Sequence, residues 1–87
     1  MVVSQITDIV RTSELVYYMD EFNALVIYDI LGNRTEGKIR FKIENTALGT
    51  KNIYITIIDQ VDYPALPLKI ELKKAIQKLI DDDALPL

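Results

Sequence analysis

The sequence predicts a single α+β domain: a mostly antiparallel sheet of four or five strands, open or rolled into a small barrel, followed by one C-terminal amphipathic helix. Two patterns lead to this fold. Charged and apolar residues alternate strictly from Lys38 to Glu44, and apolar residues recur at helical spacing between Leu68 and Leu79. A chain of 87 residues forms one core, which we assign to residues 1–80, with 81–87 as a short frayed tail.

The N-terminal half holds the less regular strands. Segment 2–12 places Ile6, Ile9 and Val10 at helical spacing, but most of its residues are β-branched, so a strand is favoured over a helix. Segments 15–19 and 24–31 are apolar at nearly every position, which predicts strands covered on both faces, with a turn at 20–23 between them. Barrel closure, the helix or another subunit would have to cover the second face.

The C-terminal half is more regular. After a flexible connection at 32–37, residues 38–44 and 52–59 form two strands joined by a loop around Gly49. A helix begins near Pro67, because proline is favoured in a first helical turn, and ends near Ile80. Its apolar stripe consists of Leu68, Leu72, Ala75, Ile76 and Leu79.

Composition narrows the chemistry. The chain has no histidine and no cysteine, so it lacks the commonest general base, the best nucleophile and thiolate metal ligands. Asp81, Asp82 and Asp83 form the one carboxylate cluster, and consecutive helical residues fan apart instead of converging. We therefore expect no enzyme activity, no metal site and no cofactor.

The same composition predicts a compartment. A small domain without cysteine fits a reducing compartment, and no apolar run approaches the length of a membrane span. The first residues carry Asp8 and Arg11, where a signal peptide would be apolar. We expect a cytoplasmic protein without membrane contact.

Charge is segregated along the chain: residues 1–37 are mostly acidic, 38–80 mostly basic, and three aspartates follow. The basic row Lys38, Arg40 and Lys42, with Tyr54 on the next strand, could follow a phosphate backbone, which makes an oligonucleotide-binding domain the alternative function. The preferred interpretation is the polar side of an amphipathic strand, paired with acids from the N-terminal half.

Exposed apolar residues favour a different function. Adjacent strand residues point to opposite faces, so one of Tyr17 and Tyr18 lies outside the core and suits an interface. Ile70 falls on the polar side of the helix and can join Tyr63 and Leu66 in a patch at the helix entrance. We expect a small non-catalytic protein–protein interaction or regulatory module that forms a homodimer, and nucleic acid is the less favoured partner.

Overall fold

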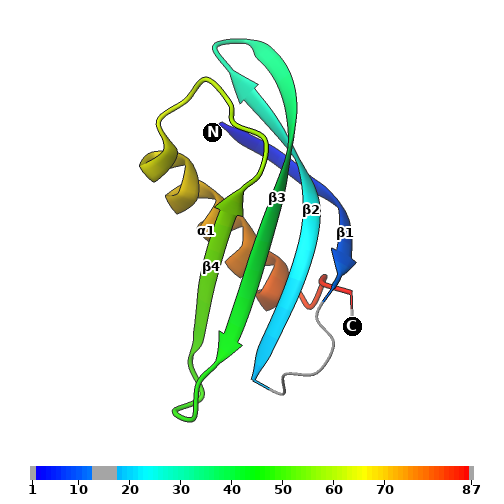
Figure 1. The fold of residues 1–87 in the computed structure, drawn as a ribbon, viewed down its shortest axis with the longest axis vertical. Helices are drawn as coiled ribbons and strands as arrows, with labels where there is room; N and C mark the ends of the chain where they lie inside the picture. The colour runs from blue at the N-terminus through cyan, green and yellow to red at the C-terminus, as the bar shows by residue number, and fades with distance from the viewer. Residues whose placement is uncertain (1, 13–17, 87) are drawn as a thin grey trace.

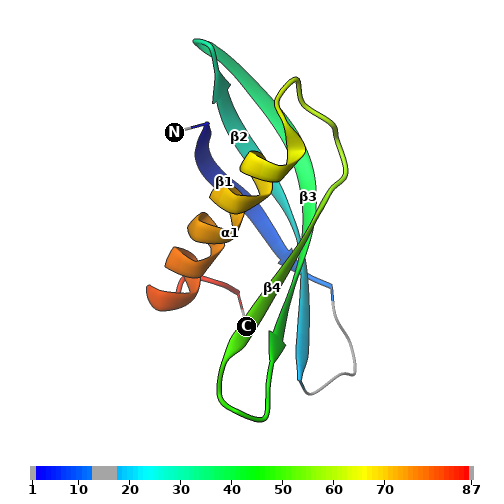
Figure 2. The same cartoon turned by 90° about the vertical axis from the view of Figure 1, so that its left-hand side faces the viewer.

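The sheet is an open antiparallel meander, and the helix that follows it lies across one face (Figures 1 and 2). The computed structural model describes residues 2–12 and 18–86. The strand order is β1-β2-β3-β4, and the two edge strands do not pair in the described part of the chain. The α+β prediction is confirmed, and the barrel alternative is wrong. The elements are β1 (Val3–Arg11), β2 (Met19–Ile30), β3 (Asn33–Asn45), β4 (Lys51–Ile57) and α1 (Ala65–Asp81).

Strand β1 explains why the N-terminal segment looks helical in sequence. Its register against β2 shifts twice, between Val3 and Gln5 and between Thr7 and Val10. Each shift inserts a residue that breaks the period of two. Val3 is buried, and Ile6 and Ile9 pack against the core, so one face of a strand acquires a spacing of three. The predicted strand is confirmed.

Strand β2 is longer than the sequence predicts. It runs without a break through residues 20–23, so the turn expected there is wrong. The physical reason is Phe22, which is buried and stacks on Phe41 of β3 with ring centroids 5.0 Å apart. That contact holds the segment in the sheet although its neighbours are polar. The strand predicted at 15–19 falls mainly on residues 15–17, which lie outside the described residues.

The connection from β2 to β3 is also shorter than predicted. Only Leu31 and Gly32 form the turn, with φ of 51° and 80°, and Ile30 pairs with Asn33. Two consecutive positive φ values are typical of the two-residue hairpin turn whose twist matches the strands. Residues 33–37 therefore belong to β3, and the flexible connection predicted at 32–37 is wrong.

The core lies between the sheet and α1. Leu68, Leu72 and Ile76 are buried along the inner side of the helix, as the apolar stripe predicts. The helix begins at Ala65, two residues before Pro67, because the first-turn N–H groups have no helical partner and proline removes nothing there. Leu85 also packs against the core, and the division into a domain at 1–80 and a tail at 81–87 stays a prediction.

Glu71 ties the start of the sheet to the helix. Its Oε1 accepts hydrogen bonds from the backbone N–H groups of Val2, at 2.9 Å, and Val3, at 3.2 Å. Since Glu71 lies in the middle of α1, this contact fixes one end of β1 against the helix. The helix thus spans the sheet from β4 to β1.

Candidate interaction surfaces

The face of the sheet opposite α1 is uncovered within residues 2–12 and 18–86; we call it the open face. Directly paired strand residues share a face, so the register assigns its members. They alternate with the buried residues of each strand. The open face carries Gln5, Thr7, Val10, Glu21, Asn23, Leu25, Ile27, Glu36, Lys38, Arg40, Lys42, Glu44, Tyr54 and Thr56.

An apolar stripe crosses the open face. Leu25 and Ile27 of β2 are half-buried, Val10 of β1 is 58% exposed, and Ile58, which follows β4, is 47% exposed. A hollow of about 380 Å³ lies among Leu25, Ile58 and the polar residues beside them. Leu25 and Ile27 are part of the surplus hydrocarbon that the sequence predicts to need a second cover. Neither barrel closure nor the helix provides it.

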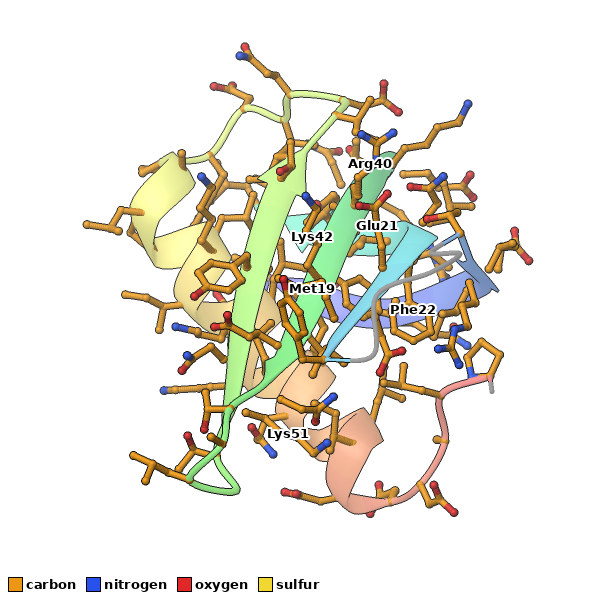
Figure 3. The ribbon with its side chains drawn as sticks, turned by 60° about the horizontal axis from the view of Figure 1, so that its bottom comes forward. Met19, Glu21, Phe22, Arg40, Lys42 and Lys51 are labelled. Carbon is orange, nitrogen blue, oxygen red and sulfur yellow. The ribbon has the colours of Figure 1, made fainter. Side chains whose placement is uncertain are left out.

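The basic row lies on the open face, where acids from β2 and β3 meet it (Figure 3). Glu21 lies 3.8 Å from Arg40 Nε and 3.5 Å from Lys42 Nζ. Arg40 also donates a hydrogen bond to Asn23 at 3.2 Å. This arrangement is the one that the preferred interpretation of the row requires, and it reduces the charge that two of the three cations could offer to phosphate.

Tyr54 also has a partner on the open face. Its hydroxyl donates to Glu44 Oε1 at 3.1 Å. That hydrogen bond, with the carboxylate charge beside it, raises the pKa of Tyr54 above its ordinary value of 10.0. The ring is half-exposed, so it remains accessible at the edge of the sheet.

The predicted interface residues separate into two places. Tyr17 lies outside the described residues, and Tyr18 is exposed at the start of β2, away from α1. Leu66 and Ile70 are 72% and 49% exposed and lie beside β4. Tyr63 is half-buried against the core at one end of the same region. The patch predicted at the helix entrance therefore extends along the β4 edge.

Sequence reasoning missed the groove to which Leu66 and Ile70 belong. It runs between β4 and α1, and we call it the β4–α1 groove. The exposed isoleucine on the polar side of the helix signalled one wall, but the other wall is set by the position of β4 at the sheet edge. That position depends on the strand order.

The described residues include no group of three or more acidic, histidine or cysteine side chains placed to hold a metal ion. None of the described helical structure is long and apolar enough to cross a membrane.

Together, the sheet, the helix and the two exposed apolar surfaces define a small α+β domain with binding faces on both layers. The chain belongs to the BB_0187 family, whose model matches residues 1–81. No curated protein and no solved structure matches the chain.

Proposed function

We propose that this protein is a non-catalytic protein–protein interaction module that forms a homodimer through the open face. The observation that carries the proposal is the apolar stripe of Val10, Leu25, Ile27 and Ile58 on the layer opposite the helix. Burying such a stripe against a second sheet removes hydrocarbon from water, which is the main driving force of association.

The charges of the open face favour a second copy as the partner. Basic and acidic residues alternate across it, so a twofold copy can place each sign against the other. A strongly basic or acidic partner would meet like charges somewhere on this surface. The charged residues are Arg34, Lys38, Arg40 and Lys42 against Glu21, Asp29, Glu36 and Glu44.

The oligonucleotide alternative has less support. Arg40 and Lys42 already lie beside Glu21, and Tyr54 is hydrogen-bonded to Glu44. A nucleic acid would have to displace these contacts and would meet the acids that make them. The lack of cysteine in so small a domain leads us further to propose a reducing compartment such as the cytoplasm.

Sedimentation equilibrium over a wide concentration range, at low and moderate salt, tests the homodimer. We expect a concentration-dependent dimer whose mass does not change when a short mixed-sequence RNA is added. Ile27→Lys should give a monomer, because it places a charge in the stripe. Leu66→Lys, an equivalent change on the exposed side of α1, should leave the dimer intact. A strict monomer at all concentrations would contradict the proposal, and a mass increase only with RNA would favour the alternative.

A further inference from the structure

The β4–α1 groove is a continuous channel on the helix side of the molecule. Three hollows of about 390, 300 and 320 Å³ follow one another along it. The first two share Ile55 and Lys69 in their linings, and the last two share Ile53 and Ile70. Strand β4 forms one wall over its whole length, Lys51–Ile57, which at about 3.3 Å per residue is a channel of roughly 20 Å.

The backbone of β4 offers unpaired hydrogen-bonding groups to this channel. The N–H of Ile58 donates to the carbonyl of Lys38 at 3.0 Å, and bonded pairs alternate along an antiparallel ladder. The β3–β4 register therefore turns Asn52, Tyr54 and Thr56 toward β3. The N–H and C=O groups of Ile53, Ile55 and Ile57 face the free edge.

The two edges of the sheet differ. Strand β1 carries two register shifts, and Glu71 already binds the N–H groups at its start. Irregularity of this kind protects an edge from pairing. Strand β4 pairs with β3 without a register shift and consists mostly of β-branched residues with a single charge, Lys51. It is the edge suited to accept another strand.

The side chains of the channel select what that strand can be. Leu66 and Ile70 supply an exposed apolar wall on the helix. Lysines stand along the channel, and no carboxylate lines it among the described residues. In the part of the chain that the structure describes, no ion pair engages Lys69 or Lys73. The four lysines are Lys51, Lys69, Lys73 and Lys74.

We propose that an extended, acidic segment of a partner protein binds in the β4–α1 groove as a fifth strand of the sheet. Its backbone pairs with the outward groups of Ile53, Ile55 and Ile57. Apolar side chains on its helix-facing side contact Leu66 and Ile70, and its carboxylates meet Lys69 and Lys73. Strand addition of this kind takes affinity from main-chain hydrogen bonds and specificity from alternate side chains. The groove and the open face lie on opposite layers, so peptide binding and homodimerisation succeed or fail independently.

Two other occupants fit the groove less well. A second copy pairing β4 with β4 would bring two sets of these lysines together, which is unfavourable. A nucleic acid would satisfy the lysines, but a phosphodiester backbone has no donors for the outward carbonyls of β4 and would leave them unpaired beside an apolar wall. An acidic peptide supplies donors, acceptors and negative charge at once.

Selection from a library of random eight-residue peptides tests the proposal on the intact chain. We expect enrichment of sequences that alternate β-branched residues with Asp or Glu, and binding of the best peptide that weakens as salt rises. Absence of enrichment, or enrichment of basic sequences, would overturn the proposal. A twelve-nucleotide mixed-sequence RNA is measured in parallel, and tighter binding of the RNA through the same lysines would assign the groove to nucleic acid.

Two pairs of variants separate the backbone from the charge contribution. Ile55→Pro removes an outward N–H without removing a β3–β4 hydrogen bond, and it should weaken the selected peptide about tenfold, whereas Ile55→Val should bind normally. Lys69→Glu should also weaken binding about tenfold, whereas Lys78→Glu, the same change on α1 outside the groove, should have little effect. Circular dichroism confirms that each variant is folded. Equal binding by folded Ile55→Pro and Ile55→Val would overturn strand addition, and equal binding by Lys69→Glu and Lys78→Glu would overturn the charge contact.

Discussion

The ring of Tyr28 occupies the space that a side chain at Gly37 would need. A Cβ atom at Gly37 would lie 3.2 Å from Cε2 of Tyr28 and 3.4 Å from the carbonyl oxygen of Asp59. Gly37 is therefore required by close packing in the middle of β3, in contrast to Gly32, whose positive φ serves a turn. The contact also joins β2, β3 and the segment after β4 at one end of the core.

Gly37→Ala should lower the free energy of unfolding by about 1–2 kcal/mol. The overpacking against Tyr28 and Asp59 outweighs the smaller gain from restricting the unfolded chain. Urea denaturation of the variant measures the change. As a control, Tyr28→Leu in the same background should make Gly37→Ala much less costly, because the ring is gone. Additive losses in the double variant would show that the ring does not cause the strain.

Tyr28→Phe should raise the free energy of unfolding by about 1 kcal/mol at neutral pH. The Tyr28 hydroxyl is fully buried and has no hydrogen-bond partner among the described residues, so its removal relieves a desolvation cost. Urea denaturation at pH 7 measures the gain. A clear loss of stability in the variant would show that the hydroxyl is satisfied in solution.

The same pair of proteins should diverge further in alkali. Burial raises the pKa of Tyr28 above its ordinary value of 10.0, and the charge of Asp59 adds to the shift. Above pH 10 the unfolded tyrosine loses its proton while the folded one keeps it, so wild-type stability falls as the pH rises toward the folded pKa. The Tyr28→Phe variant lacks this loss, and denaturation between neutral pH and about pH 11 should show a growing gap.

Leu31→Asn should stabilise the β2–β3 hairpin by about 0.5–1 kcal/mol. Leu31 has a φ of 51° and is 96% exposed, so it bears the steric cost of the left-handed region without burying its side chain. Asparagine tolerates this conformation and is favoured before glycine in such turns. Thermal unfolding should show a higher midpoint, and Leu48→Asn, at the exposed tip of the other hairpin, is the control. An equal gain in both would point to surface hydrophobicity instead of φ.

Sequence patterns predicted those elements whose burial has one simple period. The alternation in 38–44 and the helical stripe from Leu68 each report a single buried face, so β3 and α1 lie where they were expected. The turns were harder because local polarity does not decide them. Residues 20–23 look like a turn, but Phe22 is held by Phe41, a contact between residues distant in the chain.

The candidate surfaces were predictable only in part. Leu66 and Ile70 stand out from sequence because they fall off the apolar stripe, and Leu25 and Ile27 because their strand is apolar on both faces. The β4–α1 groove requires knowing that β4 is an edge, which follows from the pairing of all four strands. The pairing of Glu21 with Arg40 and Lys42 likewise depends on the β2–β3 register.

Glu21→Gln tests what the basic row contributes. Its carboxylate faces Arg40 and Lys42 and lies 3.2 Å from the hydroxyl of Thr12, which donates to it. We expect the free energy of unfolding to fall by about 0.5–1 kcal/mol at low salt and by less at high salt, since partly exposed ion pairs are weak and screened. Urea denaturation at two salt concentrations measures this.

Glu36→Gln is the matched control, because it removes the same charge from the open face at a residue outside these ion pairs. Equal effects of the two variants would assign the change to overall charge. RNA binding distinguishes the two functions of the row. If Lys38, Arg40 and Lys42 followed a phosphate backbone, freeing two of them from Glu21 would strengthen RNA binding with a steep dependence on salt. We expect neither variant to bind RNA, because the row stabilises the open face of the sheet and Glu21 is its partner within the chain.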